Sequence, residues 1–288
     1  MAREAISKTE LNTVVLRPTG GWIALNLHDL WLYRELIYFM TWRDLKVRYK
    51  QTLLGVSWAV LNPFLTMVVF SVFFGGLAKI PSDGIPYPIF SFVGLLPWNL
   101  FANALLNASR SLYSNQNMVS KVYFPRLVLP LSSVIAGVVD FAIASLVLVG
   151  IILYYNLTGV THLTFSWQML TLPLYLLMAL GTALGVALWL SALYVQYHDV
   201  GYILPFLAEF WRILSPVVYS TTLIPAKWQV LYALNPMAGV VNGFRWAILG
   251  TPTGPGPELL ISMGVAVLLL LSGLAYFRRM EKTFADTI

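Results

Sequence analysis

Long apolar stretches with almost no charged side chain restrict the fold of this sequence more than any other feature. Only 10% of the 288 residues are charged, whereas 58% are hydrophobic. Because soluble domains carry about 25% charged residues, the composition excludes a water-soluble globular protein. An apolar stretch of about 20 residues crosses a bilayer as an α-helix. The sequence therefore predicts an all-α polytopic membrane protein.

The apolar stretches predict six membrane-spanning helices, at about residues 53–77, 87–108, 127–155, 167–195, 202–223 and 259–277. Pro63 lies in the first span and Pro97 in the second. Since proline removes a backbone hydrogen bond, we expect a kink at Pro63 and an interruption at Pro97. Residues 226–250 are divided at Asn235-Pro236, and each half is too short to cross. We interpret them as two short re-entrant helices before the last span.

The first 52 residues differ in character and form a predicted region of their own. A polar arm leads to a helix from about Asp29 to Lys50, which begins with aromatic and aliphatic residues and ends in cations. Aromatic rings together with cations favour the lipid headgroup region. We therefore divide the chain into a cytoplasmic arm with a helix at the lipid interface, residues 1–52, and a transmembrane domain, residues 53–288.

The distribution of cations predicts the orientation. With six spans, 14 of the 18 Lys and Arg residues lie on the side that carries both termini, 3 lie on the other side and Arg212 lies within a span. Because Lys and Arg are enriched in cytoplasmic loops, we expect both termini and residues 114–126 to be cytoplasmic. The net charge of +6 is therefore a signal of orientation and does not indicate nucleic-acid binding.

Motifs that carry enzyme chemistry are missing. The sequence has no P-loop to hold nucleotide phosphates, no Gly-x-Ser-x-Gly element and no cysteine. The three histidines, His28, His162 and His198, are far apart in the sequence. No cluster of histidines and carboxylates at metal-ligand spacing occurs. We therefore expect no active site, no metal and no cofactor on this chain.

Three charged residues lie inside predicted spans: Asp140, Glu209 and Arg212. A charge at the bilayer centre costs about 2.5–3.5 kcal/mol, so these side chains should face other helices or water. In one interpretation, Glu209 and Arg212 neutralise each other on one helical face while Asp140 bonds to a neighbouring helix. In the other, Glu209 and Arg212 border a water-filled translocation path.

Large aromatic residues recur in the first and fifth predicted spans. Aromatic side chains of membrane proteins commonly face lipid or anchor at its interface. They can also form a pore wall on which sugar rings slide through weak contacts, by analogy with aromatic pairs. The candidates for lining such a channel are Trp58, Phe64, Phe70, Phe206, Phe210, Trp211 and Tyr219.

The stretch Ser114–Arg126, SNQNMVSKVYFPR, is a polar interval between the second and third predicted spans. Its polar backbone and two cations cannot stay in hydrocarbon, so it lies outside the bilayer. It is either a solvated connecting loop or a docking element whose Tyr123 and Phe124 enter a pocket on a partner. The candidate docking residues are Asn115, Gln116, Lys121, Tyr123, Phe124, Pro125 and Arg126.

Four stretches together resemble the membrane permease subunits of type-2 ABC exporters for cell-surface polysaccharide, the family of O-antigen, capsule and teichoic-acid permeases. They are RDLKVRYKQTLLGVSWAVLNP (43–63), GLLPWNLFANAL (94–105), NQNMVSKVYFPRLVLPLSS (115–133) and LNPMAGVVNGFRWAILG (234–250). The resemblance implies six spans, a homodimer in the bacterial inner membrane and two copies of a separate ATPase subunit, which would bind ATP and Mg. It also implies that Arg43–Lys50 belongs to an amphipathic interface helix and that residues 115–126 are a coupling helix in the ATPase cleft. Outer gate helices at residues 226–250 would include Asn235, Pro236, Arg245 and Trp246.

On this resemblance we expect a channel-forming permease that moves undecaprenyl-diphosphate-linked polysaccharide out of the cytoplasm. Each cation near an anionic lipid surface contributes about 1 kcal/mol, and the expected contacts of the lipid diphosphate or of anionic headgroups are Arg43, Lys46, Arg48 and Lys50. Two alternatives stay open. One is a type-2 ABC exporter of a drug or small lipid, and the other is an ion-coupled secondary transporter with Asp140, Glu209 and Arg212 as its relay.

Overall fold

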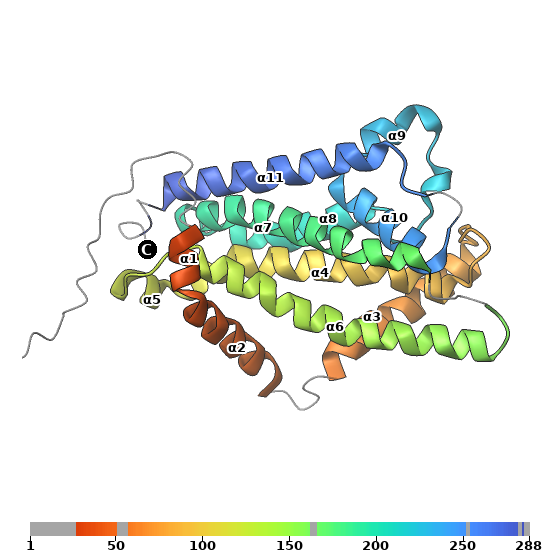
Figure 1. Ribbon diagram of the computed structural model, residues 1–288, viewed down its shortest axis with the longest axis horizontal. Coiled ribbons are helices and arrows are strands. Elements are labelled where there is room, and N and C mark those ends of the chain that lie inside the picture. The colour runs from red at the N-terminus through yellow and green to blue at the C-terminus, as the bar shows by residue number, and fades with distance from the viewer. Residues whose placement is uncertain (1–26, 51–56, 162–165, 252–253, 282–283, 285–288) are drawn as a thin grey trace, which may run out of the picture.

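All regular elements in the described residues are helices, and the long helices α4, α6, α7 and α11 run along one axis, while α2 and α3 are inclined to it (Figure 1). The computed structural model describes residues 27–50, 57–161, 166–251, 254–281 and 284. The helices are α1 (Leu27–Leu32), α2 (Arg34–Lys50), α3 (Ser57–Phe70), the π-helical η1 (Ser71–Leu77), α4 (Tyr87–Ser114), α5 (Gln116–Lys121), α6 (Val128–Leu157), the 3-10 helix η2 (Trp167–Thr171), α7 (Leu172–Gln196), α8 (Val200–Ile213), the 3-10 helix η3 (Thr221–Leu223), α9 (Ala226–Tyr232), α10 (Pro236–Leu249) and α11 (Glu258–Met280).

Five helical segments in the described part of the chain are long and apolar enough to cross a membrane. They are Val60–Leu77, Tyr87–Ser114, Val128–Leu157, Trp167–Gln196 and Glu258–Met280. Each coincides with one of the predicted spans to within a few residues, apart from the later end of the second at Ser114 and the start of the first. The predicted start of that span at residue 53 lies outside the described residues.

The fifth predicted span is shorter than expected. We predicted a helix over 202–223, but α8 contains only 14 residues and ends at Ile213. Pro216 explains the early end, because the residue before a proline disfavours the α-conformation and proline cannot donate a backbone hydrogen bond. The chain continues through turns to the short η3 and is not helical between them. Six spanning helices are therefore not observed among the described residues.

The predicted interruption at Pro97 is wrong, because α4 continues through it without a break. α4 is buried along most of its length among α6, α7 and α10, with α3 beside it. One lost backbone hydrogen bond is tolerated where neighbouring helices hold the segment in place. α3 likewise continues through Pro63 before the helix becomes π-helical at Ser71. Pro63 and Pro97 therefore do not end their helices, in contrast to Pro216 after α8.

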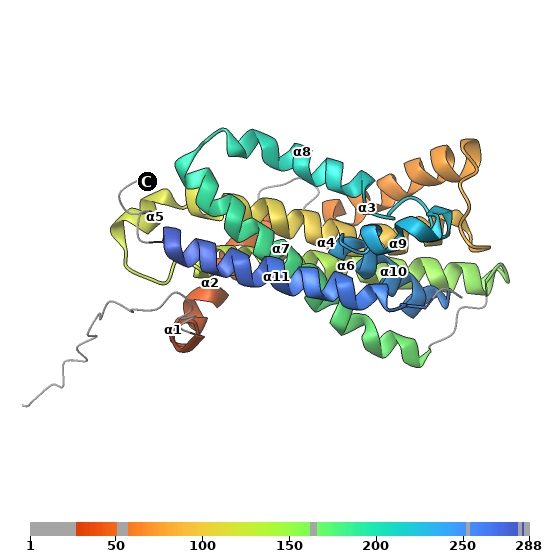
Figure 2. The same cartoon turned by 90° about the horizontal axis from the view of Figure 1, so that it is seen from above.

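The bundle has two distinct ends, which we name after the short helices that mark them (Figures 1 and 2). α1, α5 and the last turn of α11 lie at the α5 end, whereas α9, η3 and the loop before α4 lie at the α9 end. α11 approaches α7 closely at Gly185, where an added Cβ would lie 2.6 Å from the backbone of Leu269. Small residues at such crossings allow helices to pack tightly inside a membrane.

Candidate functional site

The predicted docking stretch forms the short helix α5 and a bend that leads into α6. Its two aromatic residues point in different directions: Tyr123 is 72% exposed, whereas Phe124 is 5% exposed. Phe124 packs in a core of its own subunit with Val119, Phe277 and Phe284. The docking prediction requires both rings to face outward, so it needs correction for Phe124. An apolar ring beside this core is more stable buried than held out in water.

The remaining predicted docking residues divide between anchors and an exposed surface. The amide of Asn115 donates to the carbonyl of Ser111 at 2.7 Å, which joins α5 to the end of α4. The backbone N–H of Arg126 donates to a carboxylate oxygen of Glu281 at 3.2 Å, and its guanidinium donates to the Glu281 carbonyl. Lys121 is exposed. Gln116 and Pro125 are half-buried.

The cations of α2 do not act as one group. Arg48 forms an ion pair with Asp140 of α6, and the hydroxyl of Tyr49 donates to the same carboxylate. Burial, followed by the hydrogen bond to Asp140, raises the pKa of Tyr49 above its ordinary value. Arg43 pairs with its neighbour Asp44 at 2.9 Å. Lys46 and Lys50 are exposed and form no ion pair with any residue that the structure describes.

A row of asparagines on α4, which the sequence analysis did not single out, shares a cavity with this ion pair. Asn99, Asn103 and Asn107 are four residues apart and therefore lie on one face of the helix. With Asn62 of α3 and with Arg48, Tyr49 and Asp140, they line a cavity of about 440 Å³. Their spacing in an otherwise apolar span was the available signal. The cavity gives the membrane-embedded part of the chain a polar surface.

The two charged residues of α8 neutralise each other. Arg212 and Glu209 form an ion pair at 2.5 Å, and the guanidinium of Arg212 lies 5.6 Å from the centre of the Phe70 ring. The Glu209 side chain is nevertheless 63% exposed in the single subunit. The face of α8 that carries this pair is therefore charged as well as aromatic.

The seven predicted channel-lining residues do not share one surface. Phe70 is buried beside Phe74, and Trp211 packs edge-on against Phe101 at 4.9 Å between ring centres. Tyr219 bonds to the Tyr232 hydroxyl at 2.9 Å. The exposed members of the set are Trp58, Phe64, Phe206 and Phe210. These four remain available to line a path or to face lipid.

Asn235 joins the end of α8 to the start of α10. Its side-chain amide nitrogen donates to the carbonyl of Leu214 at 3.1 Å and to the hydroxyl of Ser215 at 3.0 Å. Its oxygen accepts from the indole of Trp211 at 2.8 Å and caps α10 by accepting from a backbone N–H. Pro236 follows as the first residue of α10, where its missing N–H costs nothing. The predicted division of residues 226–250 at this dipeptide is present as two short helices, α9 and α10.

Arg245 of α10 is held inside the α9 end and is only 3% exposed. Its two terminal nitrogens donate to the carbonyls of Tyr219 at 3.0 Å and Val217 at 2.8 Å, and the guanidinium lies 3.7 Å from the centre of the Phe90 ring. Burial lowers the pKa of Arg245, although a guanidinium stays protonated at neutral pH. Trp246 packs against Trp167 at 5.9 Å. These contacts fix α10 to the loop that follows α8.

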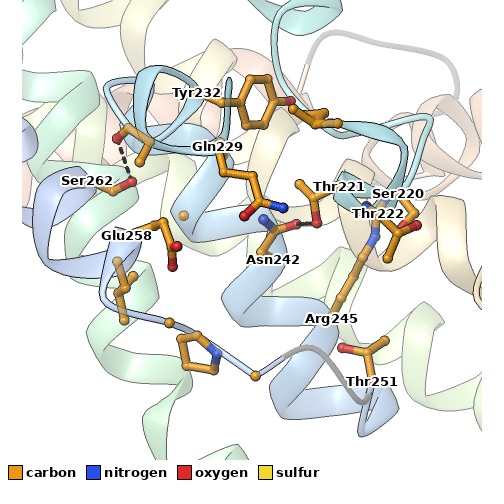
Figure 3. A pocket seen from close by; sticks show the side chains of 18 of the residues that line it. Ser220, Thr221, Thr222, Gln229, Tyr232, Asn242, Arg245, Thr251, Glu258 and Ser262 are labelled. Carbon is orange, nitrogen blue, oxygen red and sulfur yellow. Dashed lines mark hydrogen bonds between the residues drawn. The ribbon is translucent and has the colours of Figure 1, made fainter. Parts of the chain in front are cut away.

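A polar cavity of about 630 Å³ lies at the α9 end among α9, α10, the start of α11 and the loop after α8. Figure 3 shows Gln229, Asn242 and Glu258 extending into the same space from three different helices. The other polar residues that line it are Asp83, Ser220, Thr221, Thr222, Tyr232, Arg245, Thr251 and Ser262. Within the described ranges, His, Asp and Glu nowhere gather in a group that could hold a metal ion.

Residues 35–249 match the ABC-2 type transporter family. The chain is also 29% identical over 266 residues to the O-antigen export system permease protein RfbA of Myxococcus xanthus, covering 91% of this chain and 98% of that protein. It is 28% identical to the inner membrane transport permease YadH of Escherichia coli, with 74% and 83% of the two chains covered. It is 22% identical to the polysialic acid transport protein KpsM of Escherichia coli, with 83% and 91% covered.

The family match spans most of the membrane bundle, from α2 to the end of α10. Because it covers well over half of the sequence, it identifies the membrane part of an ABC transporter and sets aside the ion-coupled alternative. The chain belongs to the ABC-2 type transporter family.

Proposed function

We propose that this chain is the channel-forming subunit of an ATP-driven exporter that moves a lipid-linked polysaccharide of O-antigen type outward across a bacterial inner membrane. The observation that carries the proposal is the match to an O-antigen export permease over 91% of this chain and 98% of that relative. A likeness confined to one motif or one inserted domain would cover only a small part of the two chains. KpsM, a polysialic acid transport protein, supports the same class of cargo.

ATP hydrolysis takes place on a separate subunit in this proposal, since the chain has no P-loop. The contact surface for that subunit is the exposed side of α5 and its flanks at the α5 end. Lys121 and Tyr123 are exposed there, while Phe124 and Arg126 hold the stretch to α11. This docking segment, residues 115–126, would transmit force from the ATPase into α4, which precedes it, and into α6, which follows it.

Two copies of the chain form the transporter, with α8 near the axis between them. In one subunit α8 exposes Phe206, Phe210 and the charged pair Glu209–Arg212. An exposed charged pair is costly against lipid, because charges in hydrocarbon cost about 2.5–3.5 kcal/mol each. A second subunit or a water-filled path removes that cost. The exposed aromatic rings then face the passing sugar chain.

The sixth crossing of the membrane is made by α8 together with the turns that follow it. α8 runs from the α5 end toward the α9 end along the outer side of the bundle, beside α4 and α7 (Figure 2). The start of α2 and the end of α11 both lie at the α5 end (Figure 1). An even number of crossings is required for that arrangement. With the positive-inside distribution of Lys and Arg, it supports cytoplasmic termini.

α2 is the interface helix of this proposal, and α9 with α10 forms the re-entrant outer gate. α2 exposes the rings of Tyr38, Phe39 and Trp42, and aromatic side chains of this kind suit the headgroup region. Lys46 and Lys50 on its exposed side are the cations available to an anionic headgroup or to a lipid diphosphate. Arg48 serves instead to fix α2 to α6. The asparagine row on α4 supplies a polar surface beside the same helix.

Deletion of the gene in its host tests the proposal. We expect the surface polysaccharide to disappear from electrophoretic profiles of cell-envelope extracts, and the wild-type gene to restore it. An ATP-binding subunit should co-purify with the tagged permease. An unchanged surface polysaccharide together with a lost efflux of a drug or lipid would contradict the proposal in favour of a different ABC cargo.

A further inference from the structure

We infer that the polar cavity at the α9 end is a binding site for a neutral sugar unit of the exported glycan. The inference rests on the proposed function and assigns a role to residues beyond the gate residues discussed above. Its volume, about 630 Å³, lies within the range of about 300–1,000 Å³ that is usual for small-ligand sites. The chemistry of its lining decides which ligand it takes.

Part of the lining is already committed to internal hydrogen bonds and forms a rigid wall. The hydroxyls of Ser220 and Thr222 donate to the two carboxylate oxygens of Asp83 at 2.7 and 3.3 Å. The Ser262 hydroxyl donates to the carbonyl of Ala233 at 2.8 Å. This wall is built by the loop before α4, η3 with its N-cap residue and the start of α11, so its shape is set before a ligand arrives.

Three other polar groups converge on the open space from separate helices. Gln229 of α9, Asn242 of α10 and Glu258 of α11 extend toward one another in Figure 3. The Asn242 oxygen accepts a long hydrogen bond from Thr221 at 3.4 Å. Among the described residues, the amide of Gln229 and the carboxylate of Glu258 have no hydrogen-bond partner. Together they offer amide donors and both amide and carboxylate acceptors to one ligand.

The charge of the lining disfavours an anionic ligand, because two carboxylates face one cation. Arg245 is the single cation among the lining residues. Its two terminal nitrogens donate to the carbonyls of Tyr219 and Val217, and its buried Nε has no hydrogen-bond partner in the described part of the chain. The carboxylates of Asp83 and Glu258 repel a phosphate or a uronate. A ligand with many hydroxyls suits the site instead, because each hydroxyl donates one hydrogen bond and accepts others. A pyranose ring carries such hydroxyls around its rim.

The position of the cavity connects it to the exit of the glycan. It lies at the end of the bundle opposite α5, under α9 and beside α10, the helices of the proposed gate. Arg245 and the Asp83 cluster tie its walls to the loop after α8. A sugar unit bound there would contact α9, α10 and α11 at once. Each subunit therefore offers the emerging glycan a weak binding site before the glycan leaves the membrane.

Binding to the purified permease in lipid nanodiscs tests the assignment directly. The probe is a set of short neutral oligosaccharides, with oligogalacturonates of the same length as the anionic comparison, and saturation-transfer NMR is the measurement. We expect the neutral probe to bind and the anionic probe not to bind. Removing a hydrogen bond to a charged acceptor in Glu258→Gln should weaken binding about tenfold or more, and Gln229→Ala should weaken it by a few-fold.

Lys227→Ala is the matched control, since Lys227 is an exposed residue of α9 that does not line the cavity; it should bind like the wild type. Equal binding by all three variants, or preference for the anionic probe, would overturn the assignment. A deletion strain that keeps its surface polysaccharide contradicts the proposed function. A permease that restores the polysaccharide but binds no neutral oligosaccharide contradicts only the cavity assignment.

Discussion

Asp140 shows how one residue can set the position of a helix at the membrane boundary. A lone carboxylate in a membrane-spanning helix is expensive, and here Arg48 and Tyr49 of α2 satisfy it. The bonds that satisfy this charge also attach α2 to α6 at one specific position. Because two side chains of α2 converge on one acceptor, the carboxylate fixes the rotation of α2 as well as its distance from α6.

The Arg48–Asp140 pair should contribute measurable stability. Hydrogen bonds to charged groups contribute about 1.5–3 kcal/mol, and the two side chains are only 32% and 17% exposed. We expect Asp140→Asn and Arg48→Gln each to destabilise the purified permease by about 2 kcal/mol. Thermal unfolding in detergent measures the loss. The double variant should lose clearly less than the sum, because the two residues share one interaction.

The pair Arg43–Asp44 provides the comparison on the same helix. It is more exposed, with side chains 42% and 24% accessible, and an exposed ion pair contributes about 0–1 kcal/mol. Asp44→Asn should therefore leave the melting temperature almost unchanged. Additive losses from Arg48→Gln and Asp140→Asn would show that the two side chains are not coupled, and that α2 is held by other contacts.

At the scale of the element, the docking segment around α5 uses different residues for packing within the subunit and for contact with the ATPase. Phe124 belongs to the core that joins α5, α7 and α11, whereas Tyr123 next to it faces outward. Val122 has an extended backbone, Val122 and Tyr123 are both exposed, and the chain bends at Phe124, whose ring is buried. The sequence YF therefore places one ring inside the subunit and leaves one for a partner.

Substituting these two rings should have different consequences. Phe124→Ala removes a buried ring and should destabilise the permease by about 3–5 kcal/mol, as phenylalanine truncations in cores do. Tyr123→Ala should leave its thermal stability within about 0.5 kcal/mol, as surface substitutions usually do. It should nevertheless reduce co-purification of the ATPase subunit and the stimulation of its ATP hydrolysis. Normal assembly and stimulation with Tyr123→Ala would show that the exposed ring does not recognise the ATPase.

Sequence periodicity and composition predicted the long elements well, because a span of about 20 apolar residues has few alternatives in a bilayer. They did not predict where α8 ends, since Ser215-Pro216 lies within an apolar stretch that continues beyond it. They also missed the asparagine row, whose meaning depends on α4 facing α3 and α6. The direction of Phe124 could not be read locally either, because it is decided by residues near position 280.

At the scale of the whole molecule, the arrangement of the two ends carries the proposed mechanism. The surface for the ATPase lies at the α5 end and the polar cavity lies at the α9 end, and α4, α6, α7 and α11 run between them (Figure 1). Force applied to α5 is passed to α4 and α6, and the opposite end of α4 packs against α10, where Phe90 contacts Arg245. The scheme requires the α5 end to face the cytoplasm, where ATP is available.

That orientation can be measured because the native sequence contains no cysteine. Lys121→Cys and Lys227→Cys place single thiols at exposed positions of the α5 end and the α9 end. In intact spheroplasts, a membrane-impermeant maleimide should label position 227 and spare position 121, and both should react once the membrane is opened. Labelling of position 121 from outside would place α5 on the outer side of the membrane, where ATP is absent, so no ATPase could drive this chain through α5. Equal protection of both positions would instead contradict the exposure of the α9 end to the outer solvent.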